Sequence, residues 1–206
     1  MTALKSEVLE NHDRYLERKA LNQKFGYDID QEREFIIKKA RPISGKILEA
    51  GTGKGYFTLA LARAGFHFTS FDISGAEQRY ALLNLVYYGM EKQVHLDIAN
   101  AESLPYQDGF FDIIFAMNMI HHLSCADKVC DEFSRVLVPG GKMVLSDFNI
   151  HGLDIIEKIH ASEGRRHEVG PVSLADMKGL LIERGFKAEQ LHGINQDLLI
   201  AEGKNK

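Results

Sequence analysis

Residues 46–65 read KILEAGTGKGYFTLALARAG, and this stretch decides the fold of the chain. The apolar run ILEA indicates a short buried strand, and the apolar residues from Phe57 onward recur at helical spacing. Gly51, Gly53 and Gly55 separate the two. A strand, a glycine-rich turn and a helix in this order surround one open position with main-chain N–H groups, which favours an anionic or carboxylate-bearing ligand. A tight connection without a ligand is the alternative, but it needs fewer glycines.

The turn does not match the two common phosphate-binding motifs. The loop of nucleoside triphosphatases needs Gly-Lys followed by Ser or Thr, whereas Lys54 is followed by Gly55. The dinucleotide fingerprint G-x-G-x-x-G needs glycine where Tyr56 stands. A carboxylate, Glu49, ends the strand instead, and it suits a ligand with an ammonium or sulfonium group better than a pyrophosphate.

A second carboxylate, Asp72, ends the next apolar run. An acid at the tip of the second strand of such a sheet can hold both ribose hydroxyls of an adenosine. The alternative is a surface aspartate that caps the following helix. The glycine turn nearby favours the ribose.

Four segments carry a wider likeness: ILEAGTGKG at 47–55, SFDIS at 70–74, NAESLPYQDGFFDIIFAMNMIHHL at 100–123 and EFSRVLVPGGKMVLSDF at 132–148. Together they resemble the class I S-adenosylmethionine-dependent methyltransferases, close to the small-molecule branch that includes the ubiquinone/menaquinone C-methyltransferases. The resemblance covers about residues 45 to 150. It implies S-adenosylmethionine as cofactor and S-adenosylhomocysteine as product, and it leaves the acceptor unidentified.

Composition predicts one soluble globular domain, with 206 residues, 45% hydrophobic and 26% charged. No apolar run has the length of a membrane span, and the N-terminus lacks a signal core. Cys125 and Cys130, five residues apart, suit neither a disulfide framework nor a zinc site, so we expect a cytoplasmic protein without a metal. A net charge of −4 without a basic stripe argues against nucleic-acid binding. We expect a monomer or a homodimer.

From residue 45 onward, apolar strands alternate with helices, which predicts an α/β sheet. The runs at 111–117 and 143–145 are almost continuously apolar, as in strands covered on both faces, whereas 93–98 alternates and belongs near an edge. The turn at 193–195 indicates an antiparallel last strand. With the order that the resemblance implies, we expect a Rossmann-like, seven-stranded, mostly parallel sheet, order 3-2-1-4-5-7-6, with helices on both faces.

We divide the chain into an N-terminal helical cap, residues 1–44, and a methyltransferase domain, residues 45–206. The resemblance places a substrate-side lid around 149–172. The basic run RRH at 165–167 either meets an anionic group of the substrate or is a solvated turn, and the second reading is favoured for so short a run.

Local signals set two helix starts and one turn. Ser124 with Asp127 and Ser173 with Asp176 each predict a capping box at the start of a helix. Residues 139–141, PGG, are expected to turn the first of these helices into the fifth strand.

Two adjacent histidines follow the fourth strand. Adjacent residues on a helical turn point about 100° apart, so one of His121 and His122 is expected to face the crevice. That imidazole could take a proton from a nucleophile. The alternative is that both histidines shape the turn through hydrogen bonds to the backbone.

The resemblance also implies roles for single residues. The glycines admit the methionine moiety, Glu49 lies beside the sulfonium, and Asp72 holds the ribose. Asn100, where family members often carry aspartate, keeps one acceptor oxygen for the adenine amino group. The predicted cofactor site comprises Glu49, Ala50, Gly51, Gly53, Gly55, Asp72, Ile73, Asn100, Ala101, Glu102 and Asn118, and the catalytic candidates are His121 and His122.

The predicted activity is methyl transfer from S-adenosylmethionine to a small-molecule acceptor. A subunit that binds the cofactor and acts on a partner without transferring a methyl group is one alternative. An NAD-dependent oxidoreductase is another, and Tyr56 at the fingerprint glycine argues against it.

Overall fold

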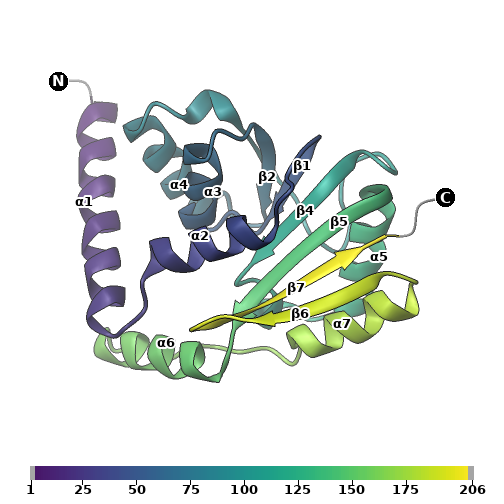
Figure 1. The fold of residues 1–206 in the computed structure, drawn as a ribbon. Helices are drawn as coiled ribbons and strands as arrows, with labels where there is room; N and C mark the ends of the chain where they lie inside the picture. Colours follow the sequence, from purple (N-terminus) through teal and green to yellow (C-terminus); the bar gives the residue numbers. More distant parts are fainter. Residues whose placement is uncertain (1–2, 204–206) are drawn as a thin grey trace.

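The structure is a computed structural model that describes residues 3–203. It is a single sheet with helices on both faces (Figure 1). The elements are α1 (Ala3–Lys24), α2 (Ile29–Lys39), β1 (Ile47–Ala50), α3 (Tyr56–Arg63), β2 (Phe68–Asp72), α4 (Gly75–Tyr87), the 3-10 turn η1 (Glu91–Gln93), β3 (Val94–Ile98), β4 (Phe111–Met117), the 3-10 turn η2 (Ile120–His122), α5 (Ala126–Val136), β5 (Leu137–Phe148), α6 (Ile150–Ser162), α7 (Leu174–Glu183), β6 (Lys187–His192) and β7 (Gln196–Glu202).

The sheet order is β3-β2-β1-β4-β5-β7-β6, which confirms the predicted order. The first five strands are parallel, and β7 runs antiparallel to both β5 and β6. β1 and β4 are neighbours in the middle of the sheet, and β3 lies at one edge as its alternating pattern predicts. The carboxyl ends of β1, β2 and β4 therefore open at one place, where parallel α/β sheets bind their ligands.

Two buried clusters cover the two faces of the sheet. On one face, apolar residues of α1 to α4 pack on the strands, with Ile36, Leu59 and Leu61 fully or almost fully buried. On the other face, α5 and α7 supply the packing through Phe133 and Met177. Because side chains of a strand alternate between faces, the central strands β1, β4 and β5 contribute residues to both clusters.

The two N-terminal helices precede the first strand in the sequence, but they pack against the rest of the domain. α1 packs along α4 and reaches α6, and α2 packs on α3 (Figure 1). Asp28 caps α2, since its carboxylate accepts hydrogen bonds from the N–H groups of Asp30 and Gln31. α6 follows β5 directly and covers the carboxyl-terminal edge of the sheet, within the segment predicted as a lid. The domain boundaries remain predictions. None of the helices between residues 3 and 203 is long and apolar enough to cross a membrane.

Two local predictions were wrong. The residue that precedes α5 is Cys125, not Ser124, and its side chain makes no capping hydrogen bond. The Ser124 hydroxyl donates to Glu102 instead. The PGG segment does not turn between α5 and β5. The strand begins at Leu137, immediately after the helix, and runs through Gly140. Gly140 has a positive φ of 74° and lies where the pairing of β5 with β4 shifts register, between Leu137 and Lys142. The capping box of Ser173 and Asp176 is confirmed.

Candidate functional site

The glycine turn between β1 and α3 has the backbone that its sequence requires. φ is 79° at Gly51, 50° at Gly53 and 80° at Gly55, all in the region that disfavours other residues. The N–H groups of Gly51 and Thr52 donate to the carbonyl of Phe71, at 2.9 and 3.0 Å, which ties the turn to the end of β2. The turn is thus held against the second strand before any ligand is considered.

The three glycines serve different purposes. A Cβ at Gly55 would lie 2.6 Å from the Cβ of Ala81, so this glycine allows α3 to pack closely on α4. A Cβ at Gly51 would lie 3.1 Å from the Met119 side chain. A Cβ at Gly53 would meet nothing within 4 Å, so the turn is open on that side. Gly51 therefore lines the cavity that a ligand could use, Gly53 has open space beside it, and Gly55 is explained by helix packing.

Asp72 lies directly at this turn. Its Oδ2 accepts the N–H of Gly53 at 2.7 Å and its Oδ1 accepts the N–H of Ser74 at 2.8 Å. These two bonds fix the carboxylate at the carboxyl end of β2, and each oxygen keeps a lone pair for a ligand hydroxyl. The sequence placed an acid here, and the structure brings it within hydrogen-bonding distance of the predicted cradle.

Glu49 points away from the open side of the turn. It shares a face of β1 with Ile47, toward α3, because strand residues alternate. Its Oε2 accepts hydrogen bonds from Thr58 at 2.8 Å and Ser70 at 2.6 Å, and the residue is 1% exposed. Burial raises the pKa of this carboxyl to about 7, against the opposing effect of the two hydroxyl donors. Glu49 lies beneath the turn rather than in the cavity beside it.

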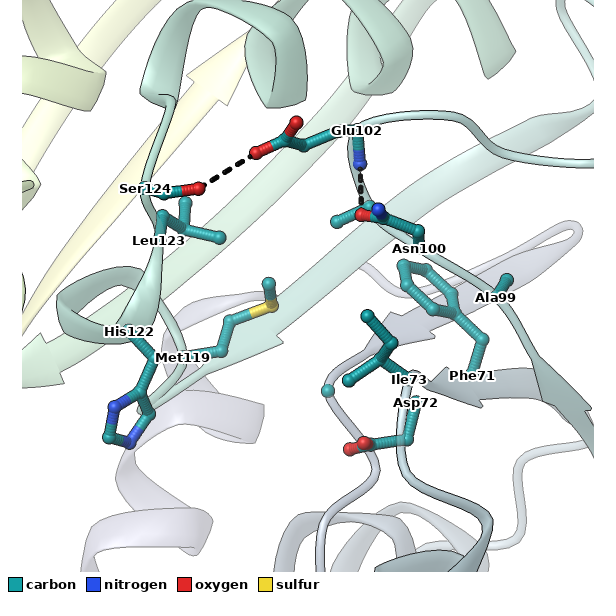
Figure 2. Close-up of a pocket in the computed structure, with 12 residues that line it drawn as sticks. Phe71, Asp72, Ile73, Ala99, Asn100, Glu102, Met119, His122, Leu123 and Ser124 are labelled. Carbon is teal, nitrogen blue, oxygen red and sulfur yellow. Dashed lines mark hydrogen bonds between the residues drawn. The ribbon is translucent and has the colours of Figure 1, made fainter.

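A first cavity of about 490 Å³ opens at the carboxyl ends of β1, β2 and β4 (Figure 2). Its lining residues are Gly51, Phe71, Asp72, Ile73, Ala99, Asn100, Ala101, Glu102, Met119, His122, Leu123 and Ser124. Seven of the predicted site residues are among them, and Figure 2 shows Asp72 and Ile73 opposite Met119 and His122. Ala50 is fully buried in β1 and does not line it.

The far end of this cavity is closed by the loop after β3. The Oδ1 of Asn100 accepts the N–H of Glu102 at 2.9 Å, so the amide oxygen predicted to face adenine is already shared with the backbone. The Glu102 carboxylate accepts from Ser124 at 3.0 Å and bridges the loop to the start of α5 (Figure 2). Asn100 can still donate through its NH₂ group.

A second cavity of about 420 Å³ adjoins the first at His122, which lines both. Residues of α1, α2, η2 and α6 and of the segment after α6 surround it. Asn118 lines this cavity and not the first one. Its φ is 53°, its N–H donates to the Ser146 carbonyl, and its Oδ1 accepts from Gln196.

His121 and Asp147 form a buried pair on the wall of the second cavity. The Nδ1–H of His121 donates to Asp147 Oδ1 at 2.5 Å, and its main-chain N–H donates to Oδ2 at 2.8 Å. In the neutral ring this bond places the proton on Nδ1, so that Nε2 carries the lone pair. Within residues 3–203 this Nε2 has no hydrogen-bond partner, although the residue is only 5% exposed.

Three further imidazoles lie beside this pair. The ring centres of His122 and His167 are 4.0 and 5.0 Å from that of His121, and His160 is 5.0 Å from His167. Burial is the main cause that lowers the pKa of His122 and His160 and lowers that of His167 to about 4. These three rings are therefore neutral near pH 7. No three His, Cys, Asp or Glu side chains in the described part of the chain are placed to hold one metal ion.

Residues 48–145 match the family described as "Methyltransferase domain". Methyltransferase GfsG of Streptomyces halstedii is 34% identical over 108 residues, which are 52% of this chain and 39% of that protein. The ubiquinone biosynthesis O-methyltransferase of Xanthomonas axonopodis pv. citri is 25% identical over 78% of this chain and 70% of its own length. A putative S-adenosylmethionine-dependent methyltransferase from Methanococcus maripaludis, 18% identical, superposes with a TM-score of 0.72 over 97% of this chain and 94% of that one, which shows the fold. Residues 48–145 thus form a methyltransferase domain, and the chain has the fold of S-adenosylmethionine-dependent methyltransferases.

The residues at the site fit S-adenosylmethionine, the cofactor that these likenesses imply. The turn leaves Gly53 open, a carboxylate stands at the end of β2, and a buried cation lines the second cavity. That cation is Arg33 of α2, which is 7% exposed and forms no ion pair within residues 3–203. Its Nη1 donates to the Tyr27 hydroxyl at 3.0 Å, and its Nε has no partner. A buried guanidinium without a counter-ion is costly unless a ligand supplies the negative charge.

Sequence reasoning missed Arg33 and Asp147. Arg33 lies in the charged run QERE, where nothing in the local pattern separates a buried arginine from its exposed neighbours. Asp147 carried a readable signal, because an acid at the carboxyl end of a central strand points to the site edge. Its partner could not be read, since His121 lies 26 residues earlier.

Proposed function

We propose that this protein transfers the methyl group of S-adenosylmethionine to a small-molecule acceptor and releases S-adenosylhomocysteine. The observation that carries the proposal is a pair of adjoining cavities whose lining residues suit different ligands. The first has the glycine turn and Asp72, which suit an adenosyl group, and the second has a histidine with a free Nε2, which suits the acceptor.

The cofactor would be held by residues from distant parts of the chain. Asp72 would accept hydrogen bonds from the ribose hydroxyls, and the loop at Asn100 and Ala101 would take the adenine. Arg33 would pair with the methionine carboxylate, which supplies the counter-ion that its guanidinium lacks. Gly51 and Gly53 would let the chain of the methionine pass close to the backbone.

Bound S-adenosylmethionine supplies an activated methyl group on a sulfonium. The protein's own task is then mainly alignment, and holding the acceptor atom in line and about 3 Å from the methyl carbon is worth several kcal/mol. For an acceptor that carries a proton on its reacting atom, His121 would accept that proton at Nε2. Asp147 would keep the imidazole in the tautomer that makes this possible and stabilise the imidazolium that results.

Two measurements test this function in order. Equilibrium dialysis of the purified protein with S-adenosylmethionine and, separately, NAD should show binding of the first alone. A screen of hydroxylated, amino and thiol metabolites for S-adenosylhomocysteine release should then identify an acceptor. Tight binding with no turnover on any acceptor would instead favour the cofactor-binding subunit, and failure to bind S-adenosylmethionine would refute the proposal.

The role of His121 has a separate test. For an acceptor with a titratable proton, His121→Gln should lower kcat about 100-fold or more and leave the affinity for S-adenosylmethionine unchanged. Asp147→Asn should also lower kcat, because the imidazole loses the carboxylate that orients it, while His122→Gln is the comparison in the neighbouring ring. A larger loss of kcat in His122→Gln than in His121→Gln would assign the base to the other histidine.

A further inference from the structure

A third cavity, of about 220 Å³, adjoins the second cavity. It is enclosed by α1, the start of α3, α4 and the chain that follows α6. Arg18 and Tyr56 line both this cavity and the second one, so the two adjoin. The three cavities therefore form one series, from the adenosine end through the histidines to this third space.

The lining of the third cavity is strongly cationic. It contains Arg14, Arg18, Lys54 and Arg165 and a single carboxylate, Glu163. Glu163 is shared, because it forms an ion pair with Arg18 and with the Nη2 of Arg165. The surplus of positive charge is local, since the chain as a whole has a net charge of −4.

Two of the four cations are available to a ligand. Arg14 forms no ion pair in the part of the chain that the structure describes. Lys54 has only a distant carboxylate, with Nζ 4.0 Å from Glu77 Oε2, in a pair about half exposed on each side. Such a contact contributes little.

The remaining lining adds neutral hydrogen-bond donors. Tyr15, Tyr56 and Tyr80 line the cavity, and burial raises the pKa of Tyr15 and of Tyr56 to about 12. The hydroxyls of Tyr15 and Tyr56 therefore stay protonated at neutral pH and can donate. By contrast, the charged groups of the first cavity are the carboxylates of Asp72 and Glu102. The series of cavities is acidic at the adenosine end and basic at the opposite end.

We propose that the third cavity binds an oxyanion, a carboxylate or a phosphate, that belongs to the methyl acceptor, whose reacting atom lies in the second cavity. The inference rests on the proposed methyl transfer and specifies its substrate class. Arginine and lysine around a small space bind such groups through charge-assisted hydrogen bonds. The carboxylate of the cofactor is assigned to Arg33, which lines the second cavity and not the third.

The first arm of the test uses simple anions as probes. The ¹⁵N-labelled full chain, saturated with S-adenosylhomocysteine, is titrated with sodium phosphate and with sodium benzoate, and the amide shifts of Lys54 to Tyr56 are followed. We expect saturable shifts there for at least one probe, and the preferred probe distinguishes phosphate from carboxylate. The double variant Arg14→Gln/Lys54→Gln should weaken this binding about tenfold or more. The control Lys92→Gln/Lys187→Gln, which removes two exposed lysines elsewhere, should not.

The second arm measures turnover with matched acceptors, each hydroxylated acid beside its neutral amide. The acids should be preferred, and the preference should fall about tenfold in the Arg14→Gln/Lys54→Gln protein. Absence of saturable shifts at this cavity, or equal use of acids and amides, would overturn the proposal. So would a loss of S-adenosylhomocysteine affinity in the double variant, because the cavity would then serve the cofactor carboxylate. In that last case cofactor binding by the wild-type chain still supports the proposed function.

Discussion

Replacing Glu49 by glutamine is expected to remove a large part of the pH dependence of folding. Burial in β1 raises the pKa of this carboxyl from 4.5 to about 7. The folded state therefore favours the protonated acid. Its stabilising contribution is fully present below the unfolded pKa, and it is lost as the pH rises through the folded pKa.

The magnitude follows from the size of the shift. Each pKa unit corresponds to about 1.4 kcal/mol, so a rise from 4.5 to about 7 amounts to about 3 kcal/mol of unfolding free energy. Glutamine keeps the shape of the side chain and an oxygen that can accept from Thr58 and Ser70, but it does not ionise. The variant should lack this loss between about pH 4.5 and about pH 8.

Urea denaturation of both proteins across this pH range provides the measurement. The unfolding free energy of the wild-type chain should fall by about 3 kcal/mol more than that of Glu49→Gln. Glu183→Gln, a change of an exposed glutamate on α7, is the control and should follow the wild type. Parallel pH curves for wild type and Glu49→Gln would refute the reasoning, because the buried carboxyl would then not titrate as its surroundings require.

Three further predictions concern the glycine turn, the ribose site and the core. Gly55→Ala should lower the unfolding free energy measured in urea by about 2 kcal/mol or more, because its Cβ would lie 2.6 Å from Ala81 at a φ of 80°. Gly53→Ala is the control and should cost about 1 kcal/mol, because its Cβ would meet no atom within 4 Å. Equal costs would contradict the packing role of Gly55. Asp72→Asn should lower the affinity for S-adenosylmethionine about tenfold in equilibrium dialysis, since amide oxygens accept hydrogen bonds less strongly than carboxylates; an unchanged affinity would remove Asp72 from the ribose site. Cys130→Ser should lower the unfolding free energy by about 1–3 kcal/mol, because it places a hydroxyl where a fully buried Sγ lies 3.8 Å from the Met177 sulfur. The control is Cys125→Ser, at a half-buried position, and similar costs at both positions would argue against burial as the cause.

The sequence determined the sheet and the glycine turn. Apolar runs distinguished the central strands from the edge strand β3, and alternate glycines specified a backbone of positive φ between β1 and α3. These signals are local, so they can be read from neighbouring residues. The place of Asp72 beside the turn followed as well, because the carboxyl ends of adjacent parallel strands must open at the same edge.

Only the tertiary structure decided which side chains meet in the cavities. Glu49 lies beneath the turn, Asp147 binds His121 rather than His122, and Arg33 of α2 lines the second cavity. The tertiary structure also placed α1 and the segment after α6 around one basic space. Local patterns specify backbone conformation, whereas a cavity is formed by the packing of helices that lie far apart along the chain, and no short stretch of sequence encodes that contact.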